Sequence, residues 1–299
     1  MQTIFIYPSA PRAIHDCIEG FFGTTPFGGD DITNHFRVVD NPKAADLFWM
    51  GQYNDKVKER WLLHPNRFAH FWDYPDKHVI ELEGDWRDQD FPLWLKPTRI
   101  ITGNAHPSHF EQGWRIFVRP VMSPLLLRLV RDPPDFRPPV QHRMWFRGQR
   151  DSRGVREKLA QALQLSRVDH TFTFLENWSV YAPPDSEVAM TYCAMMKEYS
   201  TALCPRGEGM ATCRFYEACA FGRTAVVVAD NVLAGVPPDG WPTRIPDGLS
   251  VEGMAAFLSS IYEKPHYDLC QLSRSYFDGW LTPYFRDPTK MFLNWTEFS

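Results

Sequence analysis

Residues 199–231, YSTALCPRGEGMATCRFYEACAFGRTAVVVADN, decide the fold of the chain around them. The apolar run 199–204 predicts a buried strand, which Pro205 ends because proline cannot continue a central strand. The apolar stretches that follow predict a helix over 212–221 and a second strand over 224–228. A strand, a helix and a strand in immediate succession form the unit from which parallel sheets are built.

The loop and the start of this helix have the features of an anion site. Gly207 and Gly209 allow a tight turn and a close approach of the backbone to a ligand. Thr212 is the predicted N-cap of a helix whose first turn offers free N–H groups and partial positive charge. Arg206 and Arg214 can reach the same anion, and their guanidinium groups match phosphate oxygens in pairs.

Glu217 lies one turn beyond Arg214, on nearly the same face of the helix. Its carboxylate can accept hydrogen bonds from two ribose hydroxyls. The alternative is an intrahelical salt bridge to Arg214, worth only about 0.3–0.5 kcal/mol if exposed. Composition alone leaves open whether this segment binds an anion or is a strand–helix–strand unit that binds nothing.

The same alternation continues along the rest of the chain and predicts an α/β fold with mostly parallel sheets. Further strands are predicted over 4–7, 35–39, 45–50, 78–82, 99–102, 115–118, 143–146 and 171–175. Further helices are predicted over 10–22, 56–63, 155–163, 186–198 and 251–261.

The proline-rich segment 132–139, DPPDFRPP, predicts a linker, because it can continue neither a helix nor a central strand. We therefore expect two Rossmann-like domains facing a central cleft, over residues 1–135 and 140–280. Residues 281–299 are expected to form a tail that packs back on the first domain. Ligands in such sheets bind at the carboxyl ends of the strands.

Composition excludes some classes of protein. A net charge of -4 gives no excess of positive charge for a general nucleic-acid binder. The six cysteines form no CxxC pair and no zinc-like spacing with histidine, which predicts buried free thiols and no metal site. A leader peptide and an apolar run of about 18 residues are both missing, so we expect a cytoplasmic protein without a transmembrane segment.

Three pieces of the 199–231 segment resemble the signature of exostosin-type glycosyltransferases (glycosyltransferase family 47). They are Pro205-Arg206-Gly207, the run RFYEA over 214–218, and the strand AVVVAD over 225–230 that follows Gly222. Other pieces agree in the same order along the chain, so that the resemblance extends from about residue 4 to about residue 262. These are NPKAADLF (41–48), DKHV (76–79) with GDW (84–86), and WFRG (145–148) with REKL (156–159).

The chain departs from the family pattern at two places. Thr224-Ala225 stands where the family has an aliphatic residue followed by proline, and Gly84 stands where it has histidine. Any contact made by that histidine is therefore missing. The membrane anchor of the secretory-pathway members is also absent from this chain, which fits a soluble microbial or viral relative better.

The resemblance implies a GT-B architecture and inversion at the anomeric carbon, with no metal and no cofactor. The second domain would hold a nucleotide-sugar donor, a UDP-sugar, and the first would face a glycan acceptor. Donor-binding positions would be Arg206, Gly207, Glu208, Gly209, Thr212, Arg214 and Glu217. Arg147 and Arg150 would support the leaving diphosphate, since such enzymes use arginines and a helix dipole in place of a metal.

Inversion needs one base to remove the proton of the acceptor hydroxyl. Asp85 is the first candidate, because it follows strand 78–82 at the end where such sheets place ligands. Glu83, Asp73 and Glu208 are the rival carboxylates. Asp85 can equally be an ordinary turn or N-cap residue.

Histidine and tryptophan residues add further candidates. His78 can be structural or can face the acceptor, whereas His106 and His109 are alternative bases after strand 99–102. Tryptophan rings can stack on the C–H faces of a sugar, or they can simply fill the core. The candidates for such a platform are Trp49, Trp72, Trp86 and Trp145.

Two other functions compete with a glycosyltransferase. A non-catalytic nucleotide-sugar or glycan-binding protein of the same fold would keep Arg206, Arg214 and Glu217 and would tolerate change at every candidate base. A phosphorylase or epimerase acting on a nucleotide sugar is the third candidate. An epimerase would normally show GxGxxG near the first strand, and residues 7–12, YPSAPR, do not provide it.

Overall fold

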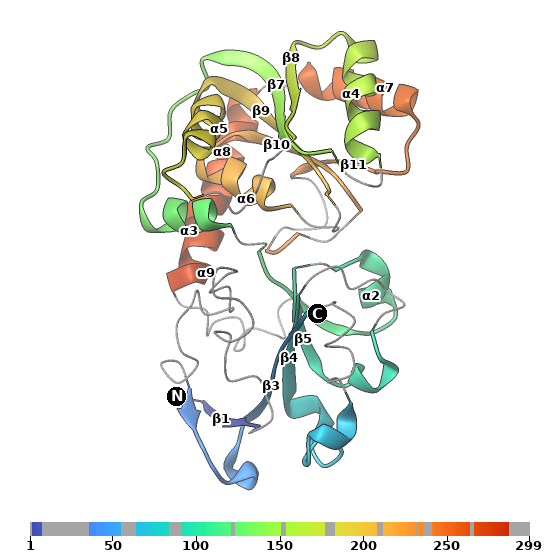
Figure 1. Cartoon of the computed structure of the whole chain (residues 1–299), viewed down its shortest axis with the longest axis vertical. Coiled ribbons are helices and arrows are strands. Elements are labelled where there is room, and N and C mark those ends of the chain that lie inside the picture. Colours follow the sequence, from blue (N-terminus) through green and yellow to red (C-terminus); the bar gives the residue numbers. More distant parts are fainter. Residues whose placement is uncertain are drawn as a thin grey trace. The chain divides into compact units, whose positions relative to one another are not determined.

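The computed structural model describes residues 2–7, 36–54, 64–83, 91–103, 105–120, 123–150, 154–176, 183–207, 212–230, 233–235, 241–263 and 266–286. The predicted helices 10–22 and 56–63 lie outside these residues, as do Asp85, Glu208 and Gly209. The chain divides into two compact units (Figure 1). The first comprises Met1–Arg119, Asn231–Ala234 and Tyr284–Ser299, and the second comprises Pro120–Asp230 and Gly235–Pro283.

The first unit contains a six-stranded sheet in the order β2-β1-β3-β4-β5-β6. Every neighbouring pair is parallel, which confirms the predicted α/β class. The strands are β1 (Thr3–Ile6), β2 (Arg37–Val38), β3 (Leu47–Asn54), β4 (His78–Glu83), β5 (Arg99–Thr102) and β6 (Arg115–Val118). A helix that the sequence did not indicate, α2 (Pro107–Glu111), precedes β6. The hydrophobic core of the first unit includes Phe48, Ile80, Ile100 and Ile116.

The second unit contains a five-stranded parallel sheet in the order β11-β10-β9-β7-β8. The strands are β7 (Gln141–Gly148), β8 (His170–Phe174), β9 (Tyr199–Pro205), β10 (Thr224–Val228) and β11 (Thr243–Ile245). The helices are α3 (Pro124–Arg131), α4 (Val155–Ser166), α5 (Glu187–Glu198), α6 (Cys213–Ala220), α7 (Val251–Tyr262) and α8 (His266–Tyr276). A π-helical turn over Phe277–Leu281 leads into α9 (Thr282–Arg286).

Apolar side chains of alternating strand positions cover both faces of this second sheet. Met144 and Phe146 of β7 belong to a core that also contains Leu159 of α4 and Leu258 of α7. Trp145 lies on the opposite face, where its ring contacts Tyr192 of α5 at a centroid distance of 5.2 Å. All eight residues of α6 are buried, because α3 and α8 pack against it.

The strand order creates a switch point between β7 and β9. The chain leaves β7, forms β8 on one side of it, and then returns to form β9 on the other side. In a doubly wound sheet, the connections after two such strands run to opposite faces and leave a crevice at their carboxyl ends. Here Arg147 and Gly148 are the last residues of β7, and Arg206 is the first residue after β9.

The proline-rich segment does not separate the two units. The first crossing between them falls at Arg119 and Pro120, whereas the sequence predicts it at 135–140. Two arginines hold the segment on the second unit: Nη1 of the buried Arg223 donates to the Arg137 carbonyl at 2.8 Å, and Nη1 of the partly buried Arg274 donates to the Pro134 carbonyl at 2.6 Å. Proline ends regular structure, but it does not decide which core the segment covers.

The end of the described chain belongs to the first unit. Tyr284 stacks on Phe117 with ring centroids 6.3 Å apart. Five of the six cysteines lie in the described residues; all five are free thiols and four are buried, as predicted, while Cys17 lies outside. Across the described ranges, the structure has no helix that is both long enough and apolar enough to cross a membrane.

Candidate functional site

The candidate site lies in the second unit, where β7 and β9 end and α4 and α6 begin. Arg206 continues the sheet for one residue, because its backbone N–H donates to the Val228 carbonyl at 3.1 Å. Arg214 is the second residue of α6. The parallel strands and the start of α6 thus position side chains that are far apart in the chain at one edge of the sheet.

Arg214 is buried, with only 5% of the residue exposed, and several contacts hold its side chain in place. Its Nη2 donates to the Arg147 carbonyl at 2.7 Å. Its guanidinium carbon lies 4.5 Å from the ring centroid of Phe146, a favourable cation–π geometry. Its Nε is buried and has no hydrogen-bond partner among the described residues.

Arg206 and Arg147 add further unpartnered donors. Arg206 is 7% exposed, and its Nη1 donates to Asp247 Oδ2 at 2.8 Å. The Nε and Nη2 of Arg206 and the Nε of Arg147 are buried, with no hydrogen-bond partner in the described part of the chain. Leaving a buried charged donor unsatisfied costs about 1–3 kcal/mol or more. Four buried guanidinium nitrogens near the switch point thus have no hydrogen-bond partner in the described part of the chain.

Arg156, in the first turn of α4, holds the two loops together. Its Nε donates to the Arg206 carbonyl at 3.2 Å and its Nη1 to the Gln149 carbonyl at 2.6 Å. A Cβ on Gly207 would lie 2.9 Å from Arg156 Nη2, so a larger residue there would require the Arg156 guanidinium group to shift. Sequence reasoning did not assign Arg156 to the site. The signal available was its place in the family-like run REKL (156–159).

Gly148 also lies close to neighbouring side chains, and little room is left for a Cβ. A Cβ at this position would lie 2.9 Å from Phe146 Cζ and 3.0 Å from Arg214 Nη2. Real Cβ atoms essentially never approach closer than this, so any larger residue would displace the ring or the guanidinium group. Glycine at the end of β7 thus leaves the space that Arg214 occupies.

Glu217 binds hydroxyl groups of its own chain. Its Oε1 accepts from Ser123 Oγ at 2.5 Å and its Oε2 from the Tyr192 hydroxyl at 2.7 Å. Only 4% of Glu217 is exposed. Burial and the negative charge of Glu217 raise the pKa of Tyr192 well above its ordinary value, so the phenol remains a neutral donor. Each carboxylate oxygen can accept a second hydrogen bond.

Two further predicted residues are Thr212, a donor-binding candidate, and Arg150, a candidate for supporting the leaving diphosphate. Thr212 is the N-cap residue of α6, but its side chain makes no capping hydrogen bond. Arg150 pairs with Glu157 Oε1 at 3.0 Å and lies over the Phe174 ring at 4.2 Å, with 66% of its side chain exposed. It differs in burial from Arg206 and Arg214.

The base candidates other than Glu208, which is outside the described residues, belong to the first unit. Asp85 is outside the described residues, and the structure describes only the backbone of Glu83. Asp73 is 67% exposed and lies 3.9 Å from His70 Nδ1, in the segment that precedes β4. It is therefore at the amino end of that strand and not at the carboxyl end where ligands bind.

His78 is a structural residue and does not face the acceptor. It is fully buried, with Nε2 2.8 Å from the Tyr7 hydroxyl and Nδ1 2.7 Å from the Tyr74 carbonyl. Burial lowers its pKa to about 4, so the imidazole is neutral near pH 7. Nδ1 then donates to Tyr74, and Nε2 accepts from Tyr7.

The other histidine and tryptophan candidates also separate by burial. His106 and His109 form a reciprocal capping box at the start of α2, with His109 buried against Phe91. Trp49 and Trp145 are core residues, whereas Trp72 is 65% exposed. Trp86 lies outside the described residues.

No protein-family model matches the chain, and no curated protein matches it either. A solved structure of a GtfA/B complex is similar, with 11% sequence identity and a TM-score of 0.43. The similarity covers 76% of this chain and 55% of that one, so the chain spans about half the length of the structure it matches.

Proposed function

We propose that this chain is an inverting, metal-independent glycosyltransferase of GT-B architecture. It would transfer a sugar from a nucleotide-diphosphate sugar, a UDP-sugar, to a hydroxyl of a glycan acceptor. The observation that supports this most strongly is the set of buried guanidinium N–H groups on Arg147, Arg206 and Arg214 that have no partner among the described residues. They lie at the switch point of a parallel sheet, where nucleotides bind in such folds.

The proposed reaction breaks the bond between the anomeric carbon and the diphosphate oxygen, so negative charge accumulates on the leaving nucleoside diphosphate. Donors already aimed at this charge in a buried site stabilise it without reorganisation. The arginines thereby take the role that a divalent cation has in other transferases. Arg206, Gly207 and Arg214 bind the diphosphate, the N-terminus of α6 faces it, and Glu217 accepts hydrogen bonds from the ribose at its remaining acceptor positions.

The acceptor hydroxyl must lose its proton as the new bond forms. We assign this proton to the Asp85 carboxylate, because Asp85 follows β4 in the sequence and ligands in such sheets bind at the carboxyl ends of the strands. Support for the architecture comes from the two all-parallel sheets, each in its own compact unit. The family-like segments fall on β3, β4, β7, β9, α6 and β10 in the order expected for exostosin-type enzymes.

The direct test is transfer from a panel of UDP- and GDP-sugars, with and without glycan acceptors and with a chelator present. We expect one donor to be turned over, unaffected by the chelator, and Asp85→Asn to lose transfer while it still binds the nucleotide. A bound nucleotide at a hundredfold excess over Kd should stabilise the fold by about 2.7 kcal/mol. Stabilisation without turnover of any donor would instead indicate a binding protein, and no stabilisation by any nucleotide would exclude the donor site.

A further inference from the structure

Asp247 is the carboxylate that contacts Arg206 at the proposed donor site. It lies in the loop between β11 and α7 and forms an ion pair with Arg206 Nη1 at 2.8 Å. Both side chains are largely buried, with 8% of Arg206 and 19% of Asp247 exposed. The pair joins residues 41 positions apart, so the two loops are fixed to each other.

Because Asp247 accepts from Nη1 of Arg206, it determines which edge of the guanidinium group is left to bind another partner. A guanidinium group offers parallel N–H pairs along an end-on edge, Nη1 with Nη2, and along a side-on edge, Nε with Nη2. The two buried Arg206 nitrogens without a hydrogen-bond partner among the described residues are Nε and Nη2. They form one complete side-on edge, which matches two oxygens of a single phosphate group.

Asp247 is itself held in place. Lys158 Nζ, from α4, donates to the backbone carbonyls of Asp247 at 2.9 Å and Leu249 at 3.1 Å. Burial opposes the charge on Asp247, but hydrogen bonds to Arg206 and Asp230 and the nearby charges of Arg206 and Lys158 hold its pKa below the ordinary value. The carboxylate is therefore ionised at neutral pH, and the contacts of Lys158 hold the Asp247 backbone near α4.

We propose that Asp247 is a positioning residue: it binds Nη1 of Arg206 so that the Nε–Nη2 edge receives one phosphate of the donor's diphosphate. This inference depends on the donor site proposed above. The simpler role for Asp247 is to balance the charge of Arg206. The two roles predict opposite effects, because removing a balancing carboxylate strengthens anion binding, whereas removing a positioning group weakens it.

The test is calorimetric titration of UDP and of inorganic pyrophosphate into the wild type, Asp247→Ala and Asp247→Asn. We expect the Kd of both probes to rise about tenfold or more in Asp247→Ala, a change of about 1.4 kcal/mol. In Asp247→Asn the amide oxygen still accepts from Nη1, so the Kd should stay within about threefold of wild type, below 1 kcal/mol. Equal or tighter binding by Asp247→Ala would overturn the positioning role.

Asp247→Glu keeps the test decisive if Asp247→Ala does not fold. This variant retains the charge but displaces the carboxylate by one methylene. Positioning predicts weaker binding of both probes, and charge balance predicts no change. An unchanged Kd in this variant would therefore also overturn the inference.

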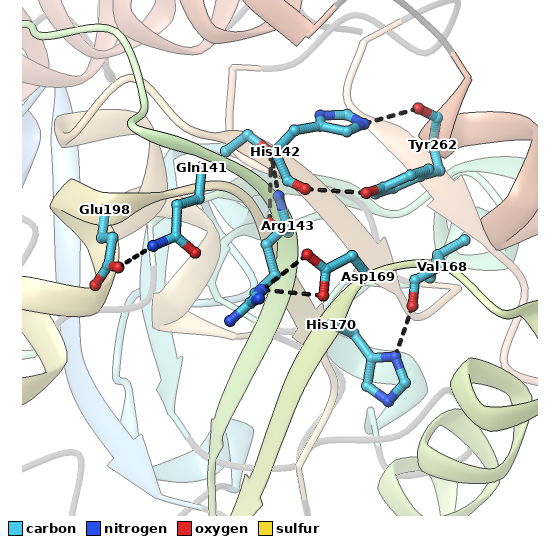
Figure 2. A network of polar contacts seen from close by, with 9 residues as sticks. Gln141, His142, Arg143, Val168, Asp169, His170, Glu198 and Tyr262 are labelled. Carbon is cyan, nitrogen blue, oxygen red and sulfur yellow. Dashed lines mark hydrogen bonds and ion pairs between the residues drawn. The ribbon is translucent and has the colours of Figure 1, made fainter.

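Asp169→Ala is the matched control, since Asp169 pairs with Arg143 at the opposite, amino end of the same sheet (Figure 2). The Arg143 Nε lies 3.1 Å from both Asp169 oxygens. Asp169→Ala removes an Arg–Asp ion pair that is more exposed than the Arg206–Asp247 pair, and it should leave the Kd of both probes unchanged. If wild type binds neither probe, the proposed donor site fails. If wild type binds and Asp247→Ala binds equally well, only the positioning role fails.

Discussion

Arg147, Arg206 and Arg214 come from a strand end, a loop and a helix start, and each buries a guanidinium nitrogen that no described residue satisfies. A typical protein satisfies more than about 90% of its buried polar groups, so three such arginines at one edge are unusual. The backbone around them is shaped to fit. Gly148 and Gly207 leave room for Arg214 and Arg156 at distances that a Cβ would block.

Gly148→Ala should therefore weaken ligand binding more than it affects folding. The added methyl group would lie 2.9 Å from Phe146 Cζ and 3.0 Å from Arg214 Nη2, so the ring and the guanidinium group must shift. We expect the Kd for UDP to rise about tenfold in calorimetric titration. Gly279→Ala, where a Cβ meets nothing within 4 Å, is the control and should bind as wild type does. Unchanged affinity in Gly148→Ala would show that the position of Arg214 is not required.

At the scale of elements, local sequence predicted β9, α6 and β10 well because each is an apolar run with a polar residue or a chain breaker close behind it. Pro205 ends β9, Gly222 follows α6, and Asp230 follows β10. The elements that were not predicted include β11, α3, α8 and α9, and the first two were missed for identifiable physical reasons. β11 has only three residues, too few for a periodic pattern. α3 begins with Ser123 as N-cap and Pro124 at its first position, which is a usual start, but it runs directly into the proline-rich segment.

The same limit applies to the candidate site. Arg206 and Arg214 were predicted because they lie in one short motif. Asp247 and Arg156 were not, because their bonds to Arg206 span 41 and 50 positions of sequence. The hydrogen bonds from Ser123 and Tyr192 to Glu217 span 94 and 25 positions, and they were likewise beyond prediction from local pattern.

His78, the first residue of β4, should make the free energy of unfolding depend on pH. Burial lowers the pKa of His78 to about 4, below its ordinary 6.5. Between these values the unfolded chain binds a proton that the folded chain does not, so the free energy of unfolding falls as pH falls from 6.5 to 4. The expected loss is up to about 3 kcal/mol from this residue.

Urea unfolding at several pH values between 7 and 4, in wild type and His78→Asn, measures this contribution. The variant is expected to be less stable at pH 7, because the stacked ring of His78 is lost from the core, and to lose less stability on acidification. Identical slopes in the two proteins would contradict the assignment of the buried neutral histidine.

At the scale of the whole molecule, the fold class followed from the sequence, but the boundary between units did not. Strand and helix alternation is a local property, and it predicted two parallel sheets. Which core a proline-rich segment joins depends on distant donors, here Arg223 and Arg274. The boundary at Arg119 and Pro120 has no comparable local signal.

Fragments test the boundary. A fragment spanning 120–283 should fold, with a helical circular dichroism spectrum and cooperative unfolding. A fragment spanning 140–283 lacks the Ser123 hydroxyl and the Arg137 carbonyl, which leaves Glu217 and Arg223 with unsatisfied buried atoms at about 1–3 kcal/mol each. It should be unfolded or non-cooperative. Equal folding of both fragments would favour a boundary after the proline-rich segment.

The central claim is that the buried arginines bind a nucleoside diphosphate, and calorimetric titration of UDP tests it most directly. Wild type should bind, and Arg214→Met should bind about a hundredfold more weakly, a change of roughly 2.7 kcal/mol. Arg143→Met, which removes a partly exposed arginine at the other end of the same sheet, should bind as wild type does. Absence of binding of UDP and GDP by wild type at millimolar concentration, or equal binding by Arg214→Met, would contradict the account.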